Sequence, residues 1–240
     1  MVDARKQAEI EYPERVPDEG REWLRTKPFR NNPREVARHI IDFGYVVQLL
    51  EIEAGMEFCE LACGSGWMTR WAARCGAHAV GYDISPGLIE IARAEAQAEG
   101  VECEFEVGDM EELDLGRRFD AVLVYDGLHH SARPDLVART AARALRPGGR
   151  FLLAEPNWKH RFQGRAASAE YGTSELGYTP TQLKRLLRRE GFTRIERFHN
   201  NRLRLFSNRP LDVVSHLAEP WVYRALAPWW TRIWLRATAT

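Results

Sequence analysis

The chain has 240 residues, of which 45% are hydrophobic and 28% charged, and its formal net charge is zero. This composition excludes a disordered or collagen-like chain, and the length suits one α/β domain with added caps. The zero net charge hides two opposite parts: residues 1–150 carry eight more acidic than basic side chains, and residues 151–240 carry eight more basic ones. The basic part either pairs with the acidic part or binds an anionic partner.

The N-terminal segment is polar and has no apolar stretch of the kind found in secretory signals. No run approaches ~18 uninterrupted apolar residues, the length that crosses a membrane. The four cysteines form no C-x-x-C pair, and no histidine stands near them at metal-ligand spacing. We therefore expect a cytoplasmic protein that needs no metal.

Residues 1–32 are polar and interrupted by prolines, which predicts an N-terminal cap. The run Asn32-Pro33-Arg34-Glu35 then predicts the start of a helix, because asparagine caps, proline fits the first helical position and glutamate reaches back. Apolar residues follow at helical spacing as far as Leu50.

Strands and helices alternate through the next hundred residues. The predicted strands are 56–62, 77–82, 102–107, 119–125 and 150–154, and the predicted helices are 66–75, 85–98 and 134–145. Strands that alternate with helices of this length predict a parallel, doubly wound sheet with right-handed crossovers.

The end of the chain departs from this alternation. Thr179 to Gln182 is a capping box that predicts a helix to Glu190, followed by a strand over 192–198, a turn at His199 and a strand over 203–206. The last two strands predict a hairpin, so one strand should be antiparallel. The whole is a seven-stranded, mostly parallel sheet in a three-layer α/β/α domain.

We expect this domain to cover residues 33–207, with residues 155–180 as an insertion on the substrate side and residues 208–240 as a C-terminal helical tail. Residues 219–236 hold four of the eight tryptophans and three arginines, a composition typical of an interfacial helix. Residues 220–240 therefore predict either a peripheral membrane contact or a helix docked on the core or on a dimer partner.

Candidate ligand-binding residues follow four of the predicted strands. The first strand runs into the glycine-rich turn Glu60-Leu-Ala-Cys-Gly-Ser-Gly66, where small residues let the chain turn sharply and let a ligand approach. Asp83 ends the second strand, where a carboxylate can bind two ribose hydroxyls. Asp109 and Met110 follow the third strand, and residues 120–130 end the fourth. Open α/β sheets bind ligands at these carboxyl ends.

A family resemblance rests on these segments. Glu60 to Gly66 resembles motif I of the class I, Rossmann-like S-adenosylmethionine-dependent methyltransferases. Val80 to Pro86 resembles the second motif and Gly108 to Met110 the third, while 119–130 and 144–156 resemble the fourth motif and the segment after it. The five matches occur in order and cover roughly residues 50–160.

The resemblance implies that the chain binds S-adenosylmethionine and releases S-adenosylhomocysteine. It assigns the methionine portion to the loop of Glu60, Ala62, Gly64, Ser65 and Gly66, the ribose to Asp83, the adenine to Asp109 and Met110, and the sulfonium end to Tyr125 or Asp126, with Ile84 as a further cofactor contact. Ala62 departs from the glycine usual at its position. A Rossmann dehydrogenase is the competing interpretation, but the longer Gly-x-Gly-x-x-Gly motif is absent.

Three residues near the expected methyl group are candidates for catalysis. His129 and His130 follow the fourth strand, where either can act as a base towards a hydroxyl, or one can pack against the next helix. Glu155 ends the fifth strand, where it can act as a base, orient the acceptor or cap the following segment. His160, Arg161 and Arg165 come next, and they can hold an anionic acceptor or be solvated surface residues.

The acceptor is narrowed by what the sequence lacks. The stretch Tyr125-Asp-Gly-Leu128 does not carry the Asn/Asp-Pro-Pro-aromatic motif of enzymes that methylate nucleobase or amide nitrogens, and no pair of glutamates follows it. No nucleic-acid-binding module precedes the core. We therefore expect an O-directed, small-molecule methyltransferase acting on a sugar, a glycan precursor or a specialised metabolite. The alternatives are a membrane-associated lipid or lipid-linked glycan methyltransferase and a non-catalytic, cofactor-binding regulator.

Overall fold

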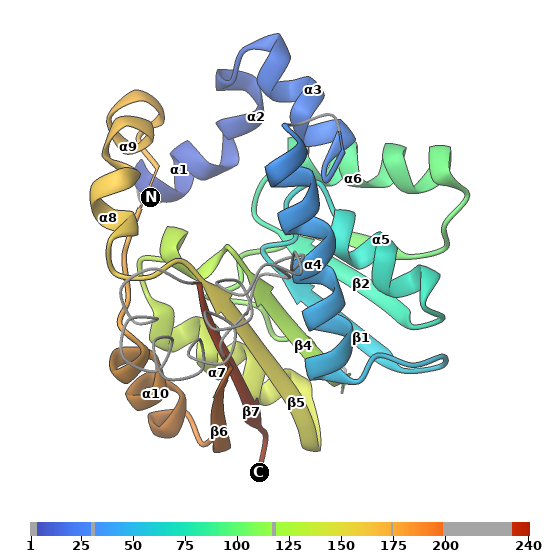
Figure 1. Ribbon diagram of the computed structural model, residues 1–240, viewed down its shortest axis with the longest axis vertical. Helices are drawn as coiled ribbons and strands as arrows, with labels where there is room; N and C mark the ends of the chain where they lie inside the picture. The colour runs from blue at the N-terminus through green and yellow to red at the C-terminus, as the bar shows by residue number, and fades with distance from the viewer. Residues whose placement is uncertain (1–3, 30–31, 117–118, 174, 199–231) are drawn as a thin grey trace, which may run out of the picture.

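The computed structural model describes residues 4–29, 32–116, 119–173, 175–198 and 232–240. Their helices and strands alternate over most of the chain (Figure 1). The helices are α1 (Ala4–Ile10), α2 (Tyr12–Arg15), α3 (Asp18–Thr26), α4 (Pro33–Leu50), α5 (Trp67–Arg74), α6 (Pro86–Glu99), α7 (Pro134–Ala144), α8 (His160–Gln163), α9 (Arg165–Tyr171) and α10 (Pro180–Arg189), with a 3-10 turn, η1 (Leu128–His130). The strands are β1 (Glu57–Leu61), β2 (His78–Asp83), β3 (Glu104–Val107), β4 (Phe119–Tyr125), β5 (Leu145–Glu155), β6 (Thr193–Phe198) and β7 (Ile233–Thr238).

The strands form one seven-stranded sheet in the order β3-β2-β1-β4-β5-β7-β6. All pairs from β3 to β5 are parallel, and β7 runs antiparallel to both β5 and β6. The chain order reverses between β1 and β4, which opens the crevice where doubly wound folds bind ligands. The predicted fold class is confirmed, including the mostly parallel sheet and its antiparallel C-terminal strand.

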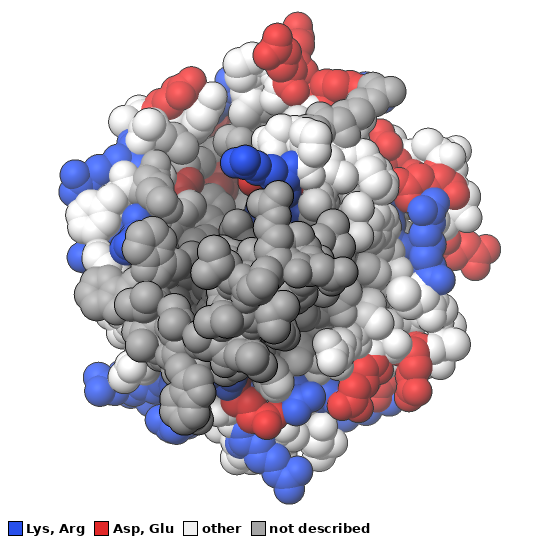
Figure 2. Space-filling model, viewed as in Figure 1, with Lys and Arg blue, Asp and Glu red and all other residues white. Residues whose placement is uncertain are grey.

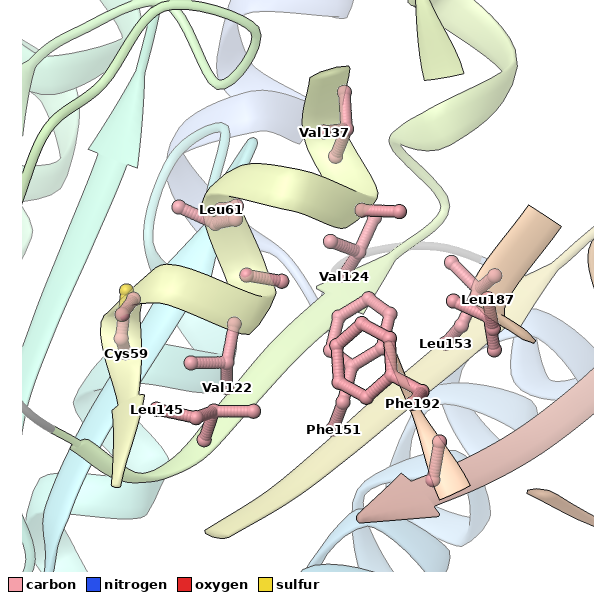
Figure 3. Packing of buried hydrophobic residues seen from close by; sticks show 14 of the residues in the cluster. Cys59, Leu61, Val122, Val124, Val137, Leu145, Phe151, Leu153, Leu187 and Phe192 are labelled. Atoms are coloured by element: carbon pink, nitrogen blue, oxygen red, sulfur yellow. The ribbon is translucent and has the colours of Figure 1, made fainter. Parts of the chain in front are cut away.

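Helices cover both faces of the sheet, as the predicted three layers require. One core joins the strands to α7 and α10, and Figure 3 shows Val137 of α7 and Leu187 of α10 directed towards strand residues such as Val124 and Leu153. Phe151 and Phe192 stack there, with ring centroids 5.1 Å apart. The opposite face packs against α4 and α5, for example through Leu50 and Met68. Because both faces are covered, the central strands β1 and β4 are buried along almost their whole length.

The predicted helix starts are correct at three positions. The side chain of Asn32 accepts hydrogen bonds from the backbone of Arg34 and Glu35. Ser85 caps α6 in the same way, and Thr179 with Gln182 forms a complete capping box. Each cap satisfies amide groups that the first turn of a helix leaves without partners.

The antiparallel strand is formed by residues other than those we predicted. Residues 203–206, chosen from the sequence as the hairpin strand, lie outside the described part of the chain, and the partner of β6 is β7. The helical tail expected over 208–240 is wrong for residues 233–238, which form β7, while 208–231 are not described. A short apolar run such as Ile-Trp-Leu fits a helix or a strand by pattern alone, and here pairing with β5 and β6 decides.

The position of Trp234 bears on the predicted membrane or dimer contact through residues 220–240. Its side chain is only 1% exposed and packs within the core, so it does not face a membrane. The other three tryptophans of this stretch lie outside the described residues. Among the helices that the structure describes, none combines the length and the apolar content needed to span a bilayer.

The opposite charges of the two parts of the chain meet in several ion pairs. Arg236 of β7 contacts Glu51, and Arg232 contacts Asp126. On the face shown in Figure 2, red and blue groups are interspersed around the grey region. These contacts favour the interpretation in which the acidic and basic parts of the chain attract each other.

The predicted division into a cap, a core, an insertion and a tail stays a prediction. Within the first segment, residues 4–26 form α1 to α3, and residues 160–171 form α8 and α9 within the expected insertion. Figure 1 shows α1 and α2 on the same side of the sheet as α8 and α9. Both segments therefore stand above the carboxyl ends of the strands.

Candidate active site

A cavity of about 370 Å³ lies at the carboxyl ends of β1, β2 and β4. It contains most of the residues that the sequence predicts. The predicted residues that line it are Glu60, Ala62, Gly64, Ser65, Asp83, Ile84, Asp109, Met110, Tyr125, Asp126, His129 and His130, and those that do not are Gly66 and Glu155. The cavity is at the lower end of the usual size range for small-molecule sites.

The loop after β1 turns through three residues with left-handed backbone. Ala62, Gly64 and Gly66 have φ angles of 57°, 56° and 72°. A methyl group on Gly64 would meet nothing within 4 Å, whereas one on Gly66 would lie 2.3 Å from the ring of Phe105. Gly64 therefore leaves room for a ligand, and Gly66 is needed for packing. At Ala62, the residue that departs from the family pattern, an alanine adopts a conformation that glycine adopts without strain.

Glu60, the last residue but one of β1, lines the pocket, and its side chain is buried. The hydroxyl of Thr69 donates a hydrogen bond to its carboxylate. Burial raises the pKa of Glu60 to about 7, although the hydrogen bond from Thr69 opposes the shift. The group therefore titrates close to neutrality.

Asp83 connects the first two strand ends. Its carboxylate accepts hydrogen bonds from the backbone N–H of Gly64 at 2.8 Å and of Ser85 at 3.0 Å. Burial raises the pKa of Asp83, and the two backbone hydrogen bonds oppose this. Each carboxylate oxygen can accept a second bond, so the side chain keeps acceptor capacity towards the pocket.

The loop after β3 is bound to the N-terminal helix. Lys6 of α1 lies 2.5 Å from the carboxylate of Asp109 and 2.8 Å from that of Glu111. Glu111 also accepts a hydrogen bond from the hydroxyl of Ser131, which follows η1. The sequence did not predict Lys6 or Glu111, because a contact between residues about a hundred positions apart leaves no local pattern. Helix α1 thus covers the predicted adenine end of the pocket.

A second group of charged residues surrounds the end of β4. Asp126 pairs with Arg232 at 2.9 Å, and the guanidinium of Arg232 lies 4.6 Å from the ring centre of Tyr125. The Tyr125 hydroxyl donates to Asp42 of α4 at 2.7 Å. Although burial acts in the opposite direction, Arg232 holds the pKa of Asp126 well below its usual range. Asp126 is therefore an anion at the predicted sulfonium end.

Lys27, which follows α3, brings a positive charge to the same pocket. Its amino group lies 4.9 Å from the ring centre of Trp23 and 6.0 Å from that of Trp67. Burial lowers the pKa of this amine. Nothing in the local sequence indicated that Lys27 would line the pocket.

Glu155 is fully buried and accepts three hydrogen bonds. The backbone N–H groups of Gly127 and Leu128 donate to Oε1 at 3.0 and 2.8 Å. His129 Nδ1 lies 2.8 Å from Oε2, so it donates there and carries the ring proton. These contacts favour the orienting role predicted for Glu155 over a role as a base, because its oxygens hold η1 and the His129 ring in place.

The two neighbouring histidines lie in different surroundings. His130 Nδ1 is 3.0 Å from the carboxylate of Glu9, and although burial opposes protonation, this contact raises the pKa of His130 to about 9. A histidine that is protonated at neutral pH cannot accept a proton there. His129 is 4% exposed, and its Nε2 faces Glu175 at 3.7 Å. Of the two predicted bases, only His129 keeps a ring nitrogen available.

The segment after β5 contributes only part of what was predicted. His160 lines the pocket, and its Nε2 lies 2.6 Å from Glu175 Oε2. Arg161 and Arg165 are exposed and lie against the ring of Phe162, outside the pocket. The structure therefore gives these two arginines no contact with an acceptor, while it adds Glu175, which the sequence did not predict.

Comparisons with known proteins agree with this architecture. Residues 58–149 match the family model described as a methyltransferase domain. The ubiquinone biosynthesis O-methyltransferase of Azorhizobium caulinodans is 34% identical over 116 residues, which are 48% of this chain and 46% of that protein. The chain spans about half the length of the curated relatives it matches.

Solved structures resemble nearly the whole chain. The magnesium protoporphyrin IX methyltransferase of Synechocystis, solved with bound S-adenosylhomocysteine, has a TM-score of 0.66 at 17% identity and covers 98% of this chain and 100% of its own. The [4+2]-cyclase SpnF has a TM-score of 0.62 at 20% identity, covering 88% and 86%. At such identities the likeness shows the fold alone. Together with the family model, it confirms the resemblance to class I S-adenosylmethionine-dependent methyltransferases.

Proposed function

We propose that this chain, whose residues 58–149 match the family model of a methyltransferase domain, transfers the methyl group of S-adenosylmethionine to a hydroxyl oxygen of a small molecule. The observation that carries the proposal is the pocket itself. It brings the open turn at Gly64 together with the carboxylates of Asp83 and Asp109 at the carboxyl ends of neighbouring strands. The curated relatives are named O-methyltransferases, and this chain matches about half of their length. They support oxygen as the acceptor atom.

The proposed cofactor suits the charges of the pocket. Asp83 has acceptor capacity for ribose hydroxyls, and the family resemblance assigns the adenine to Asp109 and Met110, which line the same pocket. The methionine portion carries an ammonium and a carboxylate, and Glu60 and Lys27 supply charges opposite to these on the pocket wall. The anion at Asp126 is complementary to the positive sulfonium.

For this methyl transfer the protein mainly has to position the acceptor hydroxyl and the cofactor. The hydroxyl oxygen attacks the methyl carbon, the carbon–sulfur bond breaks with its electron pair on sulfur, and the hydroxyl proton leaves. Holding the two reactants in line and excluding water supplies ~7 to 11 kcal/mol in favourable cases. Helices α1 to α3 and His129 of η1 contribute to the lining of the pocket, and we infer that the acceptor oxygen binds beside His129.

A panel of small hydroxyl compounds tests this proposal. The purified chain is incubated with S-adenosylmethionine and sugars, glycan precursors or phenolic metabolites, and the release of S-adenosylhomocysteine is measured. We expect release with at least one acceptor and none with the same compound already methylated on that hydroxyl, which is the matched control. A product whose new methyl group is on nitrogen or carbon would refute O-methylation, and cofactor binding without turnover on any acceptor would favour the regulator.

A further inference from the structure

We propose that His129, His160 and Glu175 bind one divalent transition-metal ion in the wall of the pocket, with an open position for the acceptor hydroxyl. The binding of the ion is independent of the proposed function, whereas its role in catalysis rests on the proposed methyl transfer. The sequence predicted no metal, because these three residues belong to η1, α8 and the loop before α10 and have no recognisable spacing.

The three side chains converge on one point. One ligand atom of each residue lies within 4.8 Å of the other two. Glu175 Oε2 is 2.6 Å from His160 Nε2 and 3.7 Å from His129 Nε2. Tetrahedral zinc with bonds of ~2.0 to 2.1 Å to nitrogen and oxygen needs ligand atoms roughly 3.3 Å apart. Each of these two contacts reaches that separation with a shift of less than about 1 Å, and the two histidine nitrogens, which are at most 4.8 Å apart, need to approach by no more than about 1.5 Å.

His129 is already oriented as a ligand. Its Nδ1 donates to the buried carboxylate of Glu155, so the lone pair is on Nε2, and this ring is more than nine-tenths buried. Among the described residues, Nε2 meets no hydrogen-bond donor, and the atom it faces is an oxygen of Glu175. A lone pair opposite a carboxylate oxygen is unfavourable without a positive charge between them. Metal-binding histidines commonly donate their other ring nitrogen to a carboxylate in this way.

The ligand types decide the class of ion. Two imidazoles and one carboxylate favour zinc and similar transition metals, whereas magnesium and calcium prefer oxygen ligands alone. Binding requires His160 to lose its Nε2 proton, which Glu175 now accepts as a hydrogen bond. All three residues line the pocket, so the fourth position of a tetrahedral ion would face the space left for the acceptor.

An ion at this position would activate the acceptor. The hydroxyl oxygen coordinates the ion, which lowers the pKa of the hydroxyl, and its proton passes to solvent. The oxygen then forms its bond to the methyl carbon as the carbon–sulfur bond breaks with its electron pair on sulfur, giving the ether and S-adenosylhomocysteine. His129 acts as a ligand in this step rather than as a free base.

The test measures the metal directly. Untagged protein is stripped with a chelator and dialysed against Zn²⁺, and the bound metal is counted per chain; Co²⁺ then replaces Zn²⁺ and its visible absorption reports the coordination geometry. We expect one ion per chain with a tetrahedral spectrum. Each of His160→Ala and Glu175→Gln should weaken binding by at least the ~10- to 100-fold that loss of a supporting group costs. His78→Ala, which removes an exposed histidine at the start of β2, should bind metal like the wild type.

The two proposals fail separately. Wild-type protein that retains no more Zn²⁺ than a His160→Ala/Glu175→Gln double variant would overturn the metal site, and release of S-adenosylhomocysteine in the absence of metal would leave the methyltransferase intact. Circular dichroism and thermal unfolding without metal check that the variants fold. If they do not, the stoichiometry and the cobalt spectrum of the wild type decide alone, since a spectrum typical of six oxygen ligands would also overturn the site.

Discussion

Arg232 and Asp126 lie 106 positions apart in the chain, and their side chains form an ion pair at 2.9 Å. Asp126 follows β4 with a left-handed backbone, φ 56°, and Arg232 directly precedes β7. The insertion of β7 between β5 and β6 thus brings a cation from residue 232 to Asp126, which lines the pocket. The ion pair is a property of the fold that neither segment indicates by itself.

Replacing Arg232 by methionine should destabilise the protein. The change leaves Asp126 as a largely buried carboxylate without its partner, and since its side chain is 29% exposed we expect a loss of about 2 kcal/mol, below the ~3 to 5 kcal/mol found for fully buried pairs. Thermal unfolding should show a midpoint lower by roughly 4 to 8 °C. The Asp126→Asn/Arg232→Met double variant should recover part of this loss, whereas simple additivity of the two single changes would show that the pair contributes no coupling.

Replacing Ala62 by glycine should stabilise the protein slightly. Alanine in left-handed backbone costs ~1 to 2 kcal/mol, and the change to glycine relieves this strain in the folded state. The greater flexibility of glycine in the unfolded chain offsets ~0.5 to 1 kcal/mol of that gain in stability. We expect a net gain of roughly 0.5 to 1 kcal/mol in urea unfolding. Ala72→Gly in the middle of α5, where the backbone is helical, is the control and should destabilise. A loss of stability for Ala62→Gly equal to that of the control would contradict the strain at position 62.

The pH dependence of stability should carry a contribution from Glu60. Its pKa is about 7 in the fold and 4.5 when exposed, so between these values the folded state holds a proton that the unfolded state has released. Stability therefore falls as pH rises from about 4.5 to 7, by about 3 kcal/mol for this group, and is flat above that range. Glu60→Gln keeps an acceptor for Thr69 and should remove this fall. Parallel stability curves for the two proteins between pH 4.5 and 8 would contradict the shift.

Loss of Lys6 should loosen the N-terminal helix. Its contacts with Asp109 and Glu111 are partly buried, and we expect their removal in Lys6→Met to cost about 1 kcal/mol of local stability. Hydrogen exchange in α1 should then be about fivefold faster. Arg21→Ala, which removes an exposed ion pair with Asp18, should leave α1 unchanged. Equal exchange in wild type and Lys6→Met would show that other contacts hold α1 over the pocket.

The sequence predicted those parts of the fold that have local patterns. The alternation of strands and helices up to β5 and the caps at Asn32, Ser85 and Thr179 each rest on neighbouring residues, and each was found. The position of β7 could not be predicted, because a six-residue apolar strand gains its identity from pairing with β5 and β6. Tertiary pairing overrides local preference in such short segments.

The candidate site divides in the same way. Gly64, Asp83 and Asp109 were predicted because each follows a strand at a position where a doubly wound sheet binds ligands. Lys6 and Glu175, which line the pocket, and Arg232, which pairs with Asp126, were not, since they come from segments distant in the sequence. His129 was predicted, but its hydrogen bond to Glu155 could not be predicted from the sequence. This contact forms because the fold places the ends of β4 and β5 side by side.

Titration calorimetry with S-adenosylhomocysteine tests the central claim most directly, because it needs neither an acceptor nor a metal. We predict one binding site per chain and a marked loss of affinity in Asp83→Ala, while a nicotinamide dinucleotide produces no binding heat. The opposite pattern, with no affinity for the sulfur nucleoside and saturable binding of the dinucleotide, would contradict the account.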